Sequence, residues 1–403
     1  WRNGKWGYDV VEASDDNLVC VRVADFDRQK GVINTEKLTL RNYKGERVSD
    51  CLLNENHILI ERSGGGENQL VGATVKFSLN IKAVCSNFIS LLEIKTNYFD
   101  LDFIQYYFDH LYSLNVNKLS IKQTSGIQNL DLKQYVQNHI SFPEIFEQTQ
   151  IVLFLDTETA RIDNLISKQE KLIELLEEQR KSIISHAVTK GLNPNAPMKD
   201  SGVEWLGEVP EHWGVNRLGV HFKNRKEKVS DKDFKPLSVT KHGIVPQLEH
   251  AAKSDNGDNR KLVRKGDYVI NSRSDRKGSS GLADLDGSVS LINIVLTPFK
   301  TIHPKFSHYL LRSYLFQEEF YKYGHGIVAD LWTTNYEDMR NIHLALPSVS
   351  EQTQISNFLE QETTRIDNLI AKQEKLIEKL KEYRASIISH AVTGKIDVRE
   401  FGA

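Results

Sequence analysis

Apolar residues recur at steps of three and four along two long segments of the chain, residues 143–189 and 347–393. Neither segment contains glycine, and the only proline in each is its first residue. This spacing predicts two amphipathic helices of about forty residues each. The stripe comprises Ile162, Leu165, Ile166, Gln169, Leu172, Ile173, Leu176, Ile183 and Ala187 in the first helix, and Ile366, Leu369, Gln373, Leu376, Leu380 and Ile387 in the second. A single helix cannot bury such a stripe, so each helix needs a partner.

The two segments are an internal duplication. At a constant offset of 204 residues, 34 of 47 positions are identical without a gap, and Glu147-Gln148-Thr149-Gln150-Ile151 recurs as residues 351–355. Repeats this similar predict that the helices pack on each other as an antiparallel pair, with Gln169 and Gln373 as polar interface residues that fix the register. The alternative is that the helices belong to unrelated bundles in separate domains.

Two blocks, residues 1–142 and 213–346, are alike in plan but differ in side chains. The first has predicted strands at 18–23, 56–60, 83–94 and 140–143 and a helix at 102–114; the second has strands at 267–270, 289–296 and 342–347 and a helix at 308–320. A polar loop follows one strand of each block, at 61–69 and at 271–278. Between the blocks, residues 191–212 form an irregular connector, which Trp205 and Leu206, with Trp213 just after it, should pin to a neighbouring surface.

These elements predict an α+β fold in which two mixed α/β domains are separated by an antiparallel two-helix coiled coil, with an internal pseudo-two-fold repeat. The predicted segments are a first domain at 1–142, a long helix at 143–190, the connector at 191–212, a second domain at 213–346, and a second long helix with the C-terminal tail at 347–403.

Composition narrows the possible functions. The chain is 39% hydrophobic and 26% charged, has no run of eighteen apolar residues and no signal-peptide pattern, so we expect a cytoplasmic protein without a membrane span. Its three cysteines form neither a disulfide framework nor a zinc pattern. The net charge of −2 conceals an uneven distribution, since residues 217–277 contain sixteen Lys and Arg against eight Asp and Glu. This segment favours a polyanionic partner.

No catalytic or metal constellation is evident. Gly64-Gly65-Gly66 lacks the Lys-Ser/Thr of a phosphate-binding loop, and the histidines lack the HExxH spacing of a zinc site. The duplicated His186 and His390 are better explained as stabilising helix C-termini than as metal ligands. The sequence therefore predicts a non-enzymatic protein without a cofactor of its own.

The chemistry that remains is recognition. Arginine, lysine and polar side chains in loops after strands can donate hydrogen bonds to base edges and phosphates. The candidate DNA-binding residues are Arg62, Ser63, Asn68, Gln69, Lys122 and Thr124 in the first block and Lys241, His242, Arg273, Ser274, Arg276 and Lys277 in the second. A surrounding positive field is expected from Lys223, Arg225, Lys226, Lys228, Arg260, Lys261, Arg264 and Lys265. Taken singly, each of these residues is more often a solvated surface residue than a nucleic-acid contact.

The duplicated helices should present equivalent surfaces to a shared set of partners, because they are far more alike than the blocks. Candidate partner-binding residues lie in their common Lys-Gln-Glu-Lys-Leu stretch and just after it: Glu170, Lys171, Glu174, Glu374, Lys375 and Glu378.

The chain resembles the specificity subunits of type I restriction-modification systems. The resemblance rests on residues 346–355, which lead into a long helix, on the earlier copy of that motif, and on the linker at residues 198–213. It covers essentially the whole chain. Members of that family usually also have a linker-like segment before the first block, so the start of the first domain is expected to lie before Trp1.

The resemblance implies that the two blocks are target recognition domains, each recognising one half of a bipartite sequence in double-stranded DNA. It also implies that two methylation subunits dock on the conserved helices and that restriction subunits join for cleavage. The chain itself would do no chemistry, and S-adenosylmethionine, ATP and Mg would be used by the partner subunits. An alternative from another class is a coiled-coil scaffold with two protein-binding end domains, whose binding would lack the steep salt dependence of phosphate contacts.

Overall fold

The computed structural model describes residues 1–28, 30–66, 69–95, 97–124, 126–248, 257–326, 332–399 and 401. The chain divides into two compact units. Unit 1 comprises Trp1–Gln169 and Lys375–Ala403, and unit 2 comprises Glu170–Glu374. Unit 1 is thus built from two separate stretches of the chain, whereas unit 2 is continuous.

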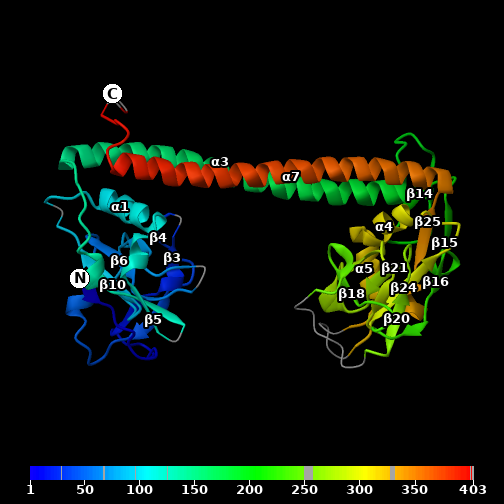
Figure 1. Cartoon of the computed structure of the whole chain (residues 1–403), viewed down its shortest axis with the longest axis horizontal. Coiled ribbons are helices and arrows are strands. Elements are labelled where there is room, and N and C mark those ends of the chain that lie inside the picture. The colour runs from blue at the N-terminus through cyan, green and yellow to red at the C-terminus, as the bar shows by residue number, and fades with distance from the viewer. Residues whose placement is uncertain are drawn as a thin grey trace. The chain divides into compact units, whose positions relative to one another are not determined.

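Unit 1 is built on an antiparallel sheet of order β1-β10-β6-β8, with strands Arg2–Asn3, Ile89–Glu93, His57–Glu61 and Thr74–Lys76. Figure 1 labels its central strands, β10 and β6. A second sheet has the order β5-β2-β9 (Thr39–Asn42, Asn17–Val21, Ala83–Cys85), and a third has the order β11-β12-β7 (Ile121–Thr124, Ile127–Leu130, Ser63–Gly64). The unit also contains the pair β3–β4 (Phe26–Asp27, Val32–Ile33) and the helices α1 (Leu101–Ser113) and α2 (Leu132–Tyr135).

Unit 2 is built on an antiparallel sheet of order β16-β24-β21-β22, with strands Phe222–Asn224, Asn293–Pro298, Tyr268–Asn271 and Ser280–Leu282. A second sheet has the order β17-β20-β23 (Lys228–Val229, Arg260–Val263, Gly287–Val289). Three strand pairs complete it: β18–β19 (Leu237–Thr240, Gly243–Pro246), β13–β14 (Met198–Asp200, Glu208–Pro210) and β15–β25 (Gly214–Arg217, His343–Leu346). Its short helices are α4 (Pro304–Arg312), α5 (Tyr314–Lys322) and α6 (Tyr336–Met339).

The main sheets of the two units correspond strand for strand. In each, the two longest strands are central and antiparallel, β10 with β6 and β24 with β21. The polar loops at 61–69 and 271–278 therefore follow topologically equivalent strands. The prediction of an α+β fold is confirmed, and the similar plan of the two blocks is visible in the strand order.

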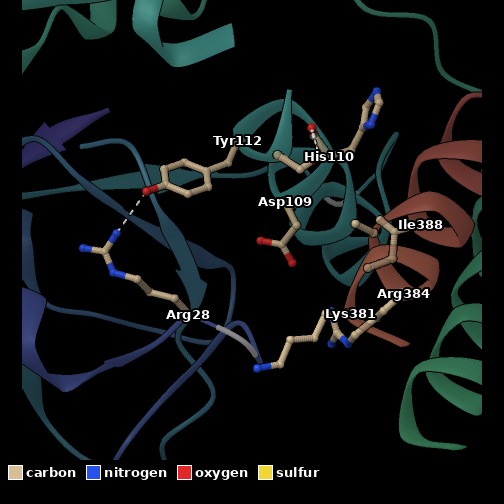
Figure 2. Close-up of a pocket in the computed structure, with 9 residues that line it drawn as sticks. Arg28, Asp109, His110, Tyr112, Lys381, Arg384 and Ile388 are labelled. Carbon is tan, nitrogen blue, oxygen red and sulfur yellow. Dashed lines mark hydrogen bonds between the residues drawn. The ribbon is translucent and has the colours of Figure 1, made fainter. Parts of the chain in front are cut away.

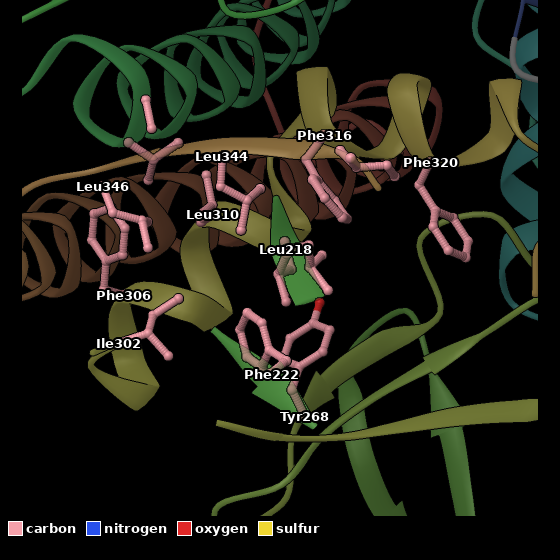
Figure 3. Packing of buried hydrophobic residues seen from close by; sticks show 14 of the residues in the cluster. Leu218, Phe222, Tyr268, Ile302, Phe306, Leu310, Phe316, Phe320, Leu344 and Leu346 are labelled. Carbon is pink, nitrogen blue, oxygen red and sulfur yellow. The ribbon is translucent and has the colours of Figure 1, made fainter. Parts of the chain in front are cut away.

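Each unit has its own apolar core. In unit 1 the buried side chains of β6, β8 and β10, among them Leu59, Val75 and Leu91, pack with Phe77. In unit 2, Phe222 and Tyr268 of the sheet belong to one buried cluster with Phe306 of α4 and the two phenylalanines of α5 (Figure 3). The same cluster includes Ala187, Val188, Ile355 and Leu359 of the long helices and Leu206 and Trp213 of the connector region. The predicted attachment of the connector through Leu206 and Trp213 is confirmed.

The long helices are α3 (Ile145–Lys190) and α7 (Val349–Val392), and α3 ends where Gly191 adopts a positive φ of 77°. Within unit 2 they run antiparallel, because Arg180 of α3 pairs with Asp367 of α7 while Val188 packs in one cluster with Ile355. Within unit 1, Arg384 of α7 pairs with Asp163 of α3, and Phe401 after α7 packs on Phe154. Each unit therefore contains an antiparallel helix pair.

The predicted stripe is only partly buried. Ile162, Ile166 and Ile366 are buried, but Leu165, Leu172 and Leu376 are 37%, 38% and 40% exposed. One neighbouring helix covers a narrow seam, so a stripe wider than that seam stays in contact with water. Within each unit the neighbouring helix therefore covers only part of the stripe. Gln169 and Gln373 are half-buried, and their role in fixing the register stays a prediction.

Several predicted elements are interrupted or absent. The helix expected at 308–320 is two helices, because Ser313 caps α5 through its side chain, which accepts from Phe316 N. The strands expected at 83–94 and 289–296 are each two strands separated by a turn: β9 and β10, and β23 and β24. Residues 140–143 form no strand, although the equivalent β25 pairs with β15. None of the helices in the described residues is long and apolar enough to cross a bilayer.

Candidate nucleic-acid interface

The loop after β21 in unit 2 is held in place by backbone and polar contacts. Asn271 Oδ1 accepts from Arg273 N at 3.1 Å, Ser272 Oγ donates to Ile292 O at 2.6 Å, and Ser274 N donates to Trp332 O at 2.9 Å. A short 3₁₀ turn, Ser274–Arg276, then leads to β22. A loop fixed by this many contacts can present its side chains with little loss of conformational entropy on binding.

The cations of this loop are paired. Arg273 donates to both carboxylate oxygens of Asp275, at 2.9 and 3.1 Å, and Arg276 lies 3.6 Å from the same carboxylate. Lys277 pairs with Glu318 of α5. Arg273 and Arg276 remain 40% and 67% exposed. Asp275 therefore holds two arginines on the surface in defined positions, which suits recognition of an electronegative base edge.

The hairpin β18–β19 brings Lys241 and His242, two further candidate DNA-binding residues, to the same region. Lys241 and His242 form its exposed tip. Arg312 at the end of α4 donates to Lys241 O and, at 3.1 Å, to Ser280 O at the start of β22. Arg312 thus ties the hairpin tip to the strand that follows the 271–278 loop.

The expected positive field around this region is smaller than the sequence suggests. Arg260 is buried and donates to Ser288 Oγ and Ser288 O, and Arg225 is bound to the buried Asp267 at 2.7 and 3.0 Å. Lys261 donates to Asn293 O at 2.6 Å, and burial lowers the pKa of both Arg260 and Lys261. These three cations are therefore structural, which corrects the prediction for them. The exposed cations of that set are Lys223, Lys226, Lys228, Arg264 and Lys265.

In unit 1 the predicted residues gather on one edge of the domain. Ser63 lies in β7 and donates to Asn129 Oδ1 of β12 at 2.6 Å, and Arg62 Nη2 donates to Asn87 O at 2.8 Å. Lys122 of β11, the next strand of that sheet, pairs with Asp131 at 2.7 Å. Thr124 ends β11, its side chain lying outside the described part, and Asn68 lies outside the described residues altogether. The three-stranded sheet thus joins the 61–66 segment to the 121–130 hairpin.

A cleft of ≈ 850 Å³ lies beside this edge, and Ser63, Gly64, Gly65 and Gln69 line it. Its other walls contain residues that sequence reasoning missed: Trp6, Arg22, Arg28 and Phe88. Arg28 lies 2.7 Å from Glu61, whose carboxylate is buried at the end of β6. Desolvation raises the pKa of Glu61, and the arginine opposes that shift. No local pattern links residues 6–28 to the 61–69 loop, so only the fold reveals this cleft.

A second cavity of unit 1, of ≈ 330 Å³, lies between α1 and α7. The Asp109 carboxyl points into it, with Arg28 on one side and Lys381 and Arg384 of α7 on the other (Figure 2). Desolvation raises the pKa of Asp109 to about 7, against a hydrogen bond from Gln105 and the charge of Arg384, which both lower it. The cavity thus lies between the globular part of unit 1 and its helix pair.

The six predicted partner-binding residues are all exposed on the long helices. Glu170, Lys171 and Glu174 lie on the part of α3 in unit 2, where Lys171 pairs with Glu174 at 2.7 Å. Glu374 belongs to unit 2, and Lys375 and Glu378 to unit 1. Their exposure satisfies the first requirement of a docking surface, and their role stays a prediction. In the part of the chain that the structure describes, no group of three metal-ligating side chains could hold an ion.

Comparison with known proteins finds one matching family model and several similar proteins. Residues 27–175 match the family described as "Type I restriction modification DNA specificity domain". The chain is 26% identical over 373 residues to the type I restriction enzyme MjaVIII specificity subunit of Methanocaldococcus jannaschii, covering 87% of this chain and 81% of that protein. It is 23% identical over 309 residues to the EcoBI specificity subunit of Escherichia coli, covering 71% and 64% of the two chains.

Two solved structures share the fold. A chain from a study of "complex assembly and conformational transition of the type I R-M system" superposes with a TM-score of 0.66 at 14% identity, covering 98% of this chain and 95% of that chain. The HsdS subunit from Thermoanaerobacter tengcongensis superposes with a TM-score of 0.54 at 15% identity, covering 94% and 91%. The matching domain, the relatives that align with most of this chain and the shared fold together make the chain similar to the specificity subunits of type I restriction-modification systems.

Proposed function

We propose that this chain recognises a bipartite target in double-stranded DNA, with unit 1 binding one half-site and unit 2 the other. The observation that supports this most directly is the placement of the two polar loops. They follow equivalent strands, β6 and β21, of sheets with the same order, yet their side chains differ. The same position in a repeated fold is thus fitted with two different sets of donors, as recognition of an asymmetric sequence requires.

In this proposal the target recognition domains are residues 1–142 and 213–346, and the duplicated helices form an antiparallel coiled coil between them. Two copies of a methylation subunit dock on the duplicated helix surfaces, since near-identical surfaces suit identical partners. Restriction subunits join that complex for cleavage in the cytoplasm. As in other specificity subunits, the chain is not an enzyme. S-adenosylmethionine, ATP and Mg would be used by the partner subunits.

Methylome sequencing tests the proposal. A host that expresses this chain with its cognate methylation subunit should acquire methylation at one bipartite motif, and replacing residues 213–346 by the corresponding block of a relative should change one half of that motif. A motif unchanged by the exchange, or methylation without any motif, would contradict the assignment.

The competing function is a coiled-coil scaffold with protein-binding end domains. The two are separated by the salt dependence of binding, because each phosphate contact releases counterions. The complex of this chain with its methylation subunits should lose affinity for duplex DNA steeply between low and physiological salt. A scaffold would bind protein partners with little salt dependence and would not retain DNA.

A further inference from the structure

A buried glutamine at the start of α3 connects the helix to the domain of unit 1. Gln148 is 1% exposed. Its Oε1 accepts from Asp100 N at 2.8 Å, and its Nε2 donates to Tyr98 O at 3.1 Å and to Pro143 O at 2.9 Å. Asp100 is the N-cap of α1. The oxygen and one amide proton of this side chain therefore attach the first turn of α3 to the N-terminus of α1, and the other amide proton binds Pro143 O just before α3.

Unit 2 contains the same arrangement at the equivalent glutamine, 204 residues later. Gln352 is fully buried, its Oε1 accepts from His303 N at 2.7 Å, and its Nε2 donates to Thr301 O at 3.1 Å and Pro347 O at 3.0 Å. His303 is the N-cap of α4. We refer to Gln148 and Gln352, with these contacts, as the glutamine joints.

A second contact lies about two helical turns further along each long helix. In unit 1, Tyr106 OH donates to Asp156 Oδ1 at 2.7 Å. In unit 2, Lys305 Nζ donates to Glu360 Oε2 at 2.8 Å. Asp156 and Glu360 are equivalent positions of the repeat. Each domain is thus attached to its helix at two points, which fixes the direction in which α1 or α4 lies along it.

The joints use only backbone groups of the domains. A glutamine that binds backbone atoms can keep the same geometry while the domain side chains vary, as they do between Asp100 and His303. An apolar residue would fill the same space but leave a buried N–H and two carbonyl groups without partners. The joint therefore fixes orientation independently of what the domain recognises.

We propose that Gln148 and Gln352 are positioning residues that set the angle of each recognition domain on its helix, and so the spacer length at which both half-sites are bound together. The inference rests on the proposed bipartite recognition. It assigns the duplicated Glu-Gln-Thr-Gln motif a role in spacer selection rather than in contacting bases or partners.

The test compares Gln148→Met, Gln352→Met and the double variant with the matched control Gln354→Met, which changes an exposed glutamine of the same motif. Each is assembled with the cognate methylation subunits. Affinity is then measured for duplexes in which the half-sites, taken from methylome sequencing, are separated by the native spacer or by one or two base pairs more or fewer. Hydrogen exchange at the amides of Asp100 and His303 reports each joint directly.

In the double variant the preference for the native spacer should fall about tenfold, roughly the factor that corresponds to one buried hydrogen bond. The double variant should keep the base preferences within each half-site. The control Gln354→Met should behave like the wild type. Gln148→Met should lose hydrogen-exchange protection only at the Asp100 amide, and Gln352→Met only at the His303 amide. An equal loss of affinity for every duplex, with the spacer preference intact, would show a purely structural role and overturn the inference. Wild-type complex without any spacer preference would instead contradict the proposed bipartite function.

Discussion

Arg384 Nε lies 3.0 Å from Asp163 Oδ1, and the residues 204 positions earlier and later, Arg180 and Asp367, form the same ion pair at 2.6 Å. The duplicated sequence has thus produced a duplicated contact, one in each unit. The two copies differ in burial: Arg384 and Asp163 are 16% and 26% exposed, whereas Arg180 and Asp367 are 41% and 56% exposed.

This difference predicts unequal contributions to stability. A double-mutant cycle with Arg384→Met and Asp163→Asn should give a coupling of about 1 kcal/mol, and the cycle with Arg180→Met and Asp367→Asn about 0.3 kcal/mol, because water screens the more exposed pair. Urea unfolding of the four variants of each cycle provides the measurement. Equal couplings would mean that burial does not distinguish the two copies.

Arg273 in the 271–278 loop should determine one base of the second half-site. Arg273→Ala should cost about 1 to 3 kcal/mol in binding to the target and relax the sequence preference at one position. Arg264→Ala, which removes an exposed cation of the same unit, serves as the control and should weaken binding without changing preference. Competition binding with single-base variants of the target distinguishes them. If both substitutions act alike, Arg273 contacts phosphate rather than a base.

Docking of the methylation subunits should depend on the duplicated charges of the long helices. Reversing Glu170 and Glu374 together to lysine should weaken assembly, because both are exposed at equivalent positions. Gel filtration of the mixture gives the result. Reversal of Glu55 and Glu211, exposed glutamates outside the helices, should leave assembly unchanged. Normal elution of the helix variant would place docking elsewhere.

Helix length should set the spacer between the half-sites. Duplicating residues 171–174 and 375–378 together adds about 6 Å to each helix, and duplex DNA rises roughly 3.4 Å per base pair. The methylated motif should keep its half-sites and gain one or two base pairs between them. Some loss of stability is expected because four residues do not match the repeat of the apolar seam. An unchanged spacer in the folded variant would refute this relation.

Asp109 should make unit 1 less stable as the pH rises. Its pKa is raised to about 7 from an ordinary 3.8, so between these values the unfolded chain releases a proton that the folded chain retains. The penalty is absent below pH 4, grows up to pH 7 and is constant above it. Asp109→Asn should therefore raise the melting temperature relative to wild type at pH 8 and make little difference near pH 4. A constant difference at all pH values would assign the effect to packing.

The features that could be predicted from the sequence are those that depend on local spacing or on the internal repeat. The long helices, the stop at Gly191 and the similar plan of the domains follow from spacing and duplication, which are visible in one dimension. The burial of Arg260 could not be predicted in this way, because nothing in a basic segment indicates that this arginine donates to Ser288. The surroundings of Asp109 were equally hidden, because Lys381 and Arg384 come from the far end of the chain. Gln148 belonged to a recognised motif, but a glutamine gives no local indication that it is buried.

The division of the chain has a consequence for its synthesis. Unit 2 is a continuous segment, Glu170–Glu374, whereas unit 1 combines Trp1–Gln169 with Lys375–Ala403. A growing chain leaves the ribosome from its N-terminus. Unit 2 can therefore complete its core while the part of α7 that pairs with Asp163 has not yet left the ribosome. The part of unit 1 formed by Trp1–Gln169 keeps the stripe of its α3 segment uncovered until Lys375–Ala403 has emerged.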